Sequence, residues 1–140
     1  MRRAGQVVRE VLELVRSTVK PGATTLDLEN AAETRLTELG VKAAFKGYHG
    51  FPCVLCTSVN SEVVHGIPSA QRVLKSGDIV SVDFGAVVDG YFGDAAITVP
   101  VVSVSTVIRL KPMPGCSTRP WRVRMAAMPI DCNAAKMTVM

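Results

Sequence analysis

The amino-terminal part of the chain carries apolar side chains with a helical period, in two stretches. Over residues 4–19, apolar positions recur every three or four residues and charged residues fall between them, a pattern typical of an amphipathic helix. A Lys-Pro-Gly sequence at 20–22 should end this helix. Thr24 and Asp27 have the spacing of a capping box, so a second helix is expected from there to Gly40. The apolar positions of the two helices are Val7, Val8, Val11, Leu12, Val15 and Val19, then Leu28, Ala31, Ala32, Leu36 and Leu39.

Beyond the second helix the pattern becomes that of strands. Residues 53–59 are predicted to form a strand, and residues 61–68 a loop or short strand that ends in a turn. Residues 79–87 and 91–99 are rich in β-branched side chains and flank an Asp-Gly dipeptide, which is typical of tight hairpins. We therefore expect an α+β fold in which two helices pack on an antiparallel sheet with a C-terminal hairpin.

Charge divides the chain into two parts. Residues 1–100 hold ten basic and eleven acidic residues, whereas residues 101–140 hold six basic residues and one acidic residue. The second part also contains five of the six Met, and its prolines interrupt any helical period. We expect a folded domain over 1–100 and an irregular basic tail over 101–140. The net charge of +4 then belongs to the tail and does not mark the domain as a nucleic-acid-binding module.

The composition is that of a folded protein without a membrane segment. With 48% apolar and 20% charged residues, the chain differs from disordered sequences. It contains no run of about 18 apolar residues, the length that a membrane span requires. Arg9, Glu10 and Glu13 interrupt the apolar run that a secretory signal needs. A cytoplasmic protein is therefore expected.

The four cysteines are expected to be free thiols, because disulfides are rare in that compartment. Cys53 and Cys56 have the spacing of half a zinc site, but Cys116 and Cys132 do not form a second pair at comparable spacing. Thiols on a partly buried strand are the preferred interpretation over a zinc or redox role.

Two aspartates occupy the middle of the predicted hairpin strands, where Asp is uncommon. With a two-residue loop, Asp83 pairs with Ala96, and Asp94 becomes its diagonal neighbour on the same face, about 5–8 Å away. Carboxylates at this separation repel each other unless a proton or a cation lies between them. A divalent metal bound by both would remove the conflict. The alternative is that one Asp faces solvent while the other caps a turn or binds backbone amides.

The two histidines lie in loops punctuated by Gly and Pro, and their positions alone are weak grounds for a functional role. His65 precedes Asp83 by 18 residues. His49 lies next to Tyr48 and close to Phe51, whose rings could line an apolar pocket or belong to the core.

Several short motifs occur together before residue 100. They read Met-Arg-Arg-Ala-Gly at 1–5, Lys-Pro-Gly-Ala-Thr-Thr at 20–25, Gly-Tyr-His-Gly-Phe-Pro at 47–52, Ser-Val-Asn-Ser-Glu-Val-Val-His-Gly-Ile-Pro at 58–68, Gly-Asp-Ile-Val-Ser-Val-Asp-Phe-Gly at 77–85 and Asp-Gly-Tyr-Phe-Gly-Asp at 89–94. With this set of motifs the chain resembles the N-terminal half of the type I methionine aminopeptidases, which belong to the pita-bread metallopeptidases.

The resemblance implies a site with two divalent metal ions, with Fe, Mn, Co, Ni and Zn as candidates. Asp83 matches the family's bidentate bridging ligand, and Asp94 matches its second bridging ligand. His65 matches the loop histidine that contacts the substrate near the scissile bond and helps to stabilise the transition state. The residues that match the family's pocket for the methionine side chain are Tyr48, Phe51 and Cys56, with His49 beside them.

The reaction that the resemblance implies is removal of the N-terminal methionine from nascent proteins. In such a site two metals lower the pKa of a bridging water and polarise the scissile carbonyl. The partner is then the N-terminal methionine of a nascent peptide, with ribosome association as a further expectation. Members of this family are monomers.

The metal ligands that the resemblance implies are incomplete in this sequence. The family takes a further His and two Glu from the second half of its fold, whereas this chain has no His after His65 and no Glu after Glu62. One explanation is a gene truncated or frameshifted near residues 101–102, with activity only in a full-length version. The alternative is a non-catalytic relative that binds RNA, ribosome or protein through its basic tail. Half a fold also leaves apolar surface uncovered, which predicts self-association.

Overall fold

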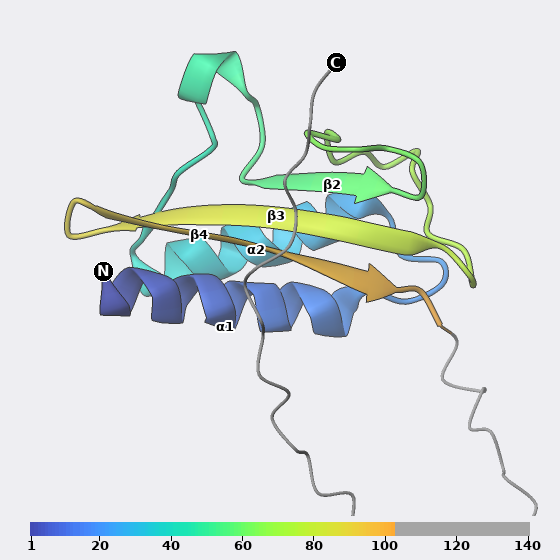
Figure 1. Ribbon diagram of the computed structural model, residues 1–140, viewed down its shortest axis with the longest axis horizontal. Helices are drawn as coiled ribbons and strands as arrows, with labels where there is room; N and C mark the ends of the chain where they lie inside the picture. Colours follow the sequence, from blue (N-terminus) through green and yellow to red (C-terminus); the bar gives the residue numbers. More distant parts are fainter. Residues whose placement is uncertain (103–140) are drawn as a thin grey trace, which may run out of the picture. The chain divides into compact units, whose positions relative to one another are not determined.

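The computed structural model describes residues 1–102 as two helices followed by an antiparallel sheet (Figure 1). This arrangement confirms the predicted α+β fold. The elements are α1 (Arg2–Thr18), α2 (Thr25–Leu39), β1 (Lys42–Ala43), the short 3-10 helix η1 (Tyr48–Gly50), β2 (Leu55–Val59), β3 (Ile79–Val88) and β4 (Tyr91–Pro100). No helix in this part of the chain has both the length and the apolar character that a membrane crossing demands. The tail was predicted over residues 101–140, but Val101 is buried in the core and its amide donates a hydrogen bond to the Asp78 carbonyl at 2.8 Å. The rest of the predicted tail, from residue 103, and a partner bound through it lie outside the described residues.

Helix α1 begins two residues earlier than expected, without a side-chain cap at Met1, and ends at Thr18, before the Lys-Pro-Gly sequence. Helix α2 begins and ends where the local sequence dictates. In α2, the Thr24 hydroxyl accepts a hydrogen bond from the Asp27 amide at 3.1 Å, and the Asp27 carboxylate accepts one from the Thr24 amide at 2.7 Å. Gly40 closes the helix in the left-handed conformation, with φ of 62°. The predicted capping box and glycine cap are both confirmed.

The ten-residue strand β3 is the centre of the sheet. It pairs with β4 along one edge and with β2 and the two-residue β1 along the other, all antiparallel. The Asp-Gly turn pairs Val88 with Tyr91 and Asp83 with Ala96, as the hairpin pattern predicted. Strand β2 begins two residues later than expected, and residues 61–68 contain no strand.

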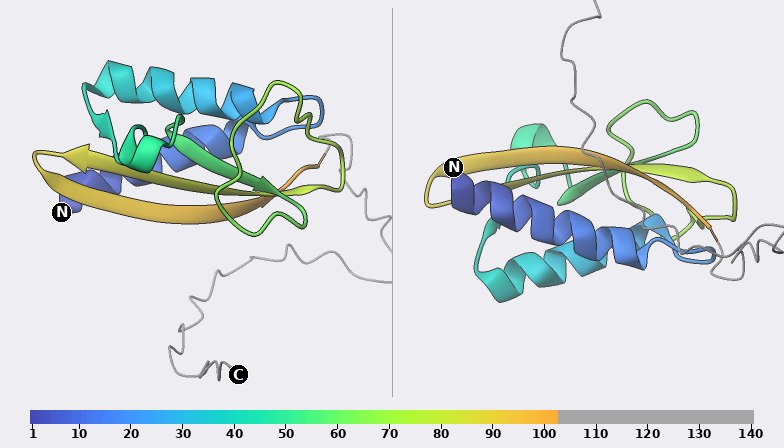
Figure 2. Two further views of the ribbon diagram at one scale, coloured as in Figure 1. Left: turned by 90° about the horizontal axis from the view of Figure 1, so that it is seen from above. Right: turned by 60° about the horizontal axis from the view of Figure 1, so that its bottom comes forward.

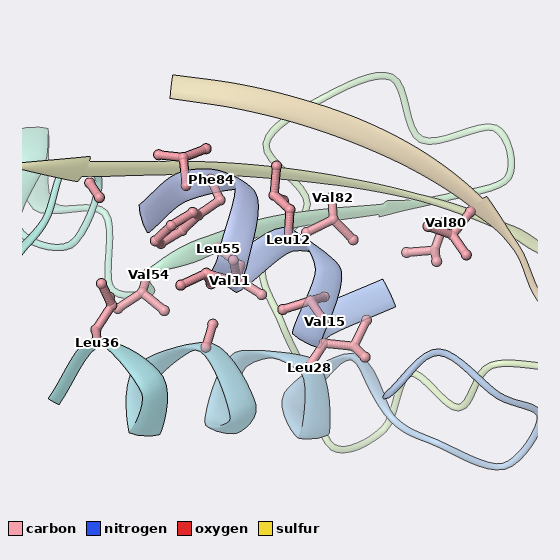
Figure 3. Packing of buried hydrophobic residues seen from close by; sticks show 14 of the residues in the cluster. Val11, Leu12, Val15, Leu28, Leu36, Val54, Leu55, Val80, Val82 and Phe84 are labelled. Atoms are coloured by element: carbon pink, nitrogen blue, oxygen red, sulfur yellow. The ribbon is translucent and has the colours of Figure 1, made fainter. Parts of the chain in front are cut away.

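The core lies between the helices and one face of the sheet (Figure 2). Alternate residues of β3 point into it, whereas Asp83 belongs to the other set, which points away from the helices. Figure 3 shows how side chains from α1, α2, β2 and β3 meet in this core. Those that are almost completely buried include Val11, Val15, Leu28, Leu55, Val82 and Phe84.

One buried carboxylate also belongs to this layer. Glu29 of α2 is only 4% exposed, and it accepts hydrogen bonds from the amides of Val54 and Leu55 at 2.6 and 2.9 Å. Burial raises the pKa of Glu29, and these two hydrogen bonds oppose the shift. Glu29 therefore attaches the start of β2 to α2 and fixes where that strand lies beside β3.

Candidate metal and substrate site

The two hairpin aspartates lie on the helix-free face of the sheet. Asp83 of β3 is opposite Cys56 of β2 on one side and Ala96 of β4 on the other. Asp94 is opposite Gly85, so it is displaced by two positions from Asp83 along the neighbouring strand. This register confirms the diagonal arrangement that the two-residue turn predicted.

The electrostatic environment of Asp83 shows that these carboxylates interact. Partial burial raises the pKa of Asp83, and the negative charge of Asp94 raises it further. A hydrogen bond from the Phe84 backbone and the nearby His65 act in the opposite direction. Two acids and a histidine therefore share one electrostatic environment, although they come from three separate segments.

The segment after β2 holds His65 beside this pair. Gly66 lies so close to β2 that its carbonyl accepts a hydrogen bond from the Thr57 amide at 2.8 Å, and its amide donates to the Ser58 hydroxyl at 3.3 Å. A Cβ at Gly66 would lie 2.1 Å from the Thr57 carbonyl oxygen, so only glycine allows this approach. His65 itself has a positive φ of 60° and is fixed by the pairing of its neighbour.

An arch between β1 and β2 forms the apolar wall of the site. It contains η1, in which the Tyr48 and His49 rings meet edge to face with their centroids 4.3 Å apart. Phe45 and Ala44 pack over Gly85, where a Cβ would lie 2.9 Å from each of them. A glycine in the middle of a strand is thus the reason why the arch can approach the sheet next to the aspartates.

These segments enclose an open pocket of about 680 Å³. All seven residues that the sequence singled out line it: Tyr48, His49, Phe51, Cys56, His65, Asp83 and Asp94. The site residues that the prediction omitted are Phe45, Gly50, Pro52 and Ile67. Gly50, Pro52 and Ile67 lie within the same loop motifs, whereas Phe45 contributes through its contact with Gly85, a long-range contact that no local pattern reveals.

The Cys56 thiol lines the pocket as a neutral group. Burial, followed by the charge of Asp83, raises the pKa of Cys56 to about 11. Cys53 and Cys56 are both free thiols in the structure. Because a thiolate is the form that binds metals and attacks electrophiles, the structure supports a wall residue at Cys56 rather than a ligand or nucleophile.

The donor set fits part of a divalent metal site. The charge of Asp94 raises the pKa of Asp83, so a cation between the two carboxylates would relieve their repulsion, and carboxylate oxygens suit hard or borderline divalent metals. Within residues 1–102, however, no group of three His, Cys, Asp or Glu side chains is placed to hold a metal ion. Asp83 and Asp94 thus offer two ligands of an incomplete set.

Comparison with known proteins identifies relatives over the same part of the chain. The model of metallopeptidase family M24 matches residues 1–110. A methionine aminopeptidase of Clostridium acetobutylicum is 50% identical over 105 residues, which are 75% of this chain and 42% of that protein. Methionine aminopeptidase 1 of Mycobacterium tuberculosis is 49% identical over 105 residues, 75% of this chain and 40% of its own length.

A solved structure supports the same grouping. The crystal structure of methionine aminopeptidase from Thermotoga maritima matches with a TM-score of 0.71 and 49% sequence identity, covering 73% of this chain and 41% of that one. The chain therefore spans about two fifths of the length of the relatives it matches.

Proposed function

Because the chain belongs to metallopeptidase family M24, we propose that it carries the N-terminal half of a methionine aminopeptidase site. In this proposal Asp83 and Asp94 bind divalent metal, with two ions of Fe, Mn, Co, Ni or Zn in the complete site. The observation that carries the proposal is the pocket that brings both aspartates and His65 against an apolar wall. Removal of an N-terminal methionine by a metallopeptidase combines a metal site with an apolar pocket that accepts the unbranched methionine side chain.

Each group has a distinct task in the proposed reaction. Tyr48, Phe51 and Cys56 bind the methionine side chain, with His49 beside them. His65 contacts the substrate near the scissile bond and stabilises the charge that develops on the carbonyl oxygen. Asp83 and Asp94 would hold a divalent metal, which when bound would supply an activated water and polarise that carbonyl. Water adds to the carbonyl carbon, the carbon–nitrogen bond breaks, and the leaving amine takes a proton.

The ligand set of the proposed metal site is incomplete in this chain. The missing ligands implied by the family would be one His and two Glu, and no His follows His65 and no Glu follows Glu62 in the sequence. We therefore expect the two aspartates to bind metal without efficient turnover by this chain alone. If its substrates are nascent peptides, the protein acts in the cytoplasm and near the ribosome.

Binding of Mn²⁺ to the chain, followed by calorimetry or electron paramagnetic resonance, tests the metal site. We expect weak binding, with a Kd of roughly 1 mM because the ligand set is incomplete, and its loss in Asp83→Asn and Asp94→Asn. Asp89→Asn is the matched control, since Asp89 lies in the hairpin turn and pairs with Arg3 outside the pocket. Equal Mn²⁺ binding by all four proteins would refute the assignment of the aspartates.

Methionine release from a Met-Ala-Ser peptide with added Mn²⁺ or Co²⁺ tests whether this chain has peptidase activity. We expect no metal-dependent release above that of Asp94→Ala. Release that Asp94→Ala abolishes would show that Asp83, Asp94 and His65 suffice for one working metal, and would overturn the requirement for further ligands.

A further inference from the structure

The arch between β1 and β2 consists of a closed tip, residues 47–51, carried by two limbs, residues 44–46 and 52–54 (Figure 1). The tip is held by its own backbone: the Gly47 amide donates to the Phe51 carbonyl at 2.8 Å, and the Phe51 amide donates to the Tyr48 carbonyl at 2.9 Å. The first limb is held to β3, because the Ala44 amide donates to the Gly85 carbonyl at 2.9 Å. The tip is therefore a preformed unit, and its place over the pocket depends on the two limbs.

The second limb is held by one side chain of α2. Val54 ends this limb and Leu55 begins β2, and their amides donate to the two carboxylate oxygens of Glu29 at 2.6 and 2.9 Å. Leu28 and Ala32, on either side of Glu29 in the helix, are 0% exposed in the core. The carboxylate thus joins the second limb to a part of the molecule that packing holds in place.

The outer edge of β2 holds the pocket from two sides. Along this edge the amides of alternate residues point away from β3 and find acceptors elsewhere in the chain. The donors and acceptors are Leu55 to Glu29, Thr57 to Gly66, and Val59 to Glu62. The Gly66 contact places His65 and is a backbone pairing that any sequence can make. The arch, in contrast, depends on the identity of a single side chain, Glu29.

The same face of α2 also reaches the first limb. Glu33 lies one turn after Glu29 and forms an ion pair with Lys46. Both side chains of this pair are about half exposed, so it contributes less than the buried contact of Glu29. The charged and titratable groups around Glu29 are Glu33 on its own helix, and Lys46 and Cys53 on the limbs.

We propose that Glu29 is a positioning residue for the pocket, which holds the second limb of the arch at the separation from Asp83 that a methionine side chain requires. The inference rests on the proposed function, which assigns that side chain to the pocket. Cys56 directly follows Leu55 and lies opposite Asp83, so a displaced Leu55 amide also moves this wall of the pocket.

A carboxylate is suited to this task because its two acceptor oxygens belong to one rigid group. It accepts from two successive amides at once, whereas an amide side chain has one acceptor oxygen and turns an N–H donor toward the other amide. A pocket whose wall is held in place does not have to be ordered when the ligand binds. Loss of one hydrogen bond from Glu29 should therefore weaken ligand binding as well as stability.

NMR spectra of the full 140-residue chain measure the position of the arch without reference to catalysis. Glu29→Gln keeps the size of the side chain and removes one acceptor. We expect the amide signals of Tyr48 and Phe51, at the tip, to shift in the folded variant. A role in stability alone would lower the unfolding temperature and leave these signals unchanged. Glu38→Gln is the matched control, since it removes the same charge from α2 and its partner Arg35 lies outside the pocket.

Titration with methionine amide, followed by the same signals, measures the effect on the pocket. We expect its Kd to rise about tenfold in Glu29→Gln, at most about threefold in Lys46→Met, and not at all in Glu38→Gln. Glu29→Asp provides a second variant that keeps the charge and both acceptors. Because its side chain is shorter by about 1.5 Å, it should also shift the tip signals and weaken binding.

Unchanged tip signals and an unchanged Kd in both Glu29 variants would overturn the inference. A larger effect of Lys46→Met than of Glu29→Gln would also overturn it, because the arch would then be positioned through its first limb. Failure of the original chain to bind methionine amide would instead count against the proposed function. The tip signals would still decide whether Glu29 positions the arch.

Discussion

Asp94→Asn tests whether the paired aspartates destabilise the metal-free protein. The substitution keeps the size of the side chain and removes one of two negative charges on the helix-free face. At about 6 Å in a water-accessible site, two such charges repel by about 0.7 kcal/mol. Since the repulsion is absent from the variant, we expect its free energy of unfolding at pH 7 to rise by about 0.5–1 kcal/mol.

The pH dependence has a definite sign. The pKa of Asp83 is raised in the folded state, so the stability linked to its protonation is present at low pH and is lost as pH rises through that value. The gain from Asp94→Asn should therefore be present at pH 7 and vanish near pH 3, where Asp83 is protonated and the repulsion is gone. Urea unfolding in EDTA at these pH values measures it.

Metal reverses the order of stability of the original chain and Asp94→Asn. Mn²⁺ at about ten times its Kd should stabilise the original chain by about 1.4 kcal/mol and leave Asp94→Asn unchanged. Asp89→Asn is the control, and should lower stability slightly because it removes the ion pair with Arg3. A loss of stability in Asp94→Asn at pH 7, or an equal gain at pH 3, would refute the reasoning.

Three further predictions concern the residues that support the site. Glu29→Ala should lower the free energy of unfolding in urea by about 2–5 kcal/mol, because it leaves two buried amides unpaired. Glu29→Gln retains an acceptor and should cost less. Equal losses in the two variants would contradict the role of Glu29 as the acceptor for these amides. Gly66→Ala should lower stability by about 1–3 kcal/mol and shift the NMR signals of His65, because the new methyl group would meet the Thr57 carbonyl. Iodoacetamide at pH 8 should alkylate Cys56 at least about tenfold more slowly in the folded chain than in urea, since the Cys56 pKa of about 11 keeps the thiol protonated. Similar rates in the two states would show that the Cys56 thiol is exposed or ionised in the folded chain.

Local sequence patterns were sufficient for the helices and the hairpin. The capping box at Thr24, the glycine at the end of α2 and the Asp-Gly turn each act over a few residues, so the sequence specifies them directly. The shared face of Asp83 and Asp94 follows from the turn alone, because parity along two paired strands fixes it. The family resemblance added two further predictions, that His65 contacts the substrate and that the arch binds the methionine side chain.

The remaining features depend on contacts between distant segments. No local signal shows that Glu29, on an otherwise ordinary amphipathic helix, is buried against the start of β2. The same holds for Phe45 over Gly85, although a glycine within a strand is a sign that another segment approaches there. Such contacts are set by packing and by the pairing of buried amides, which periodicity along the chain does not record.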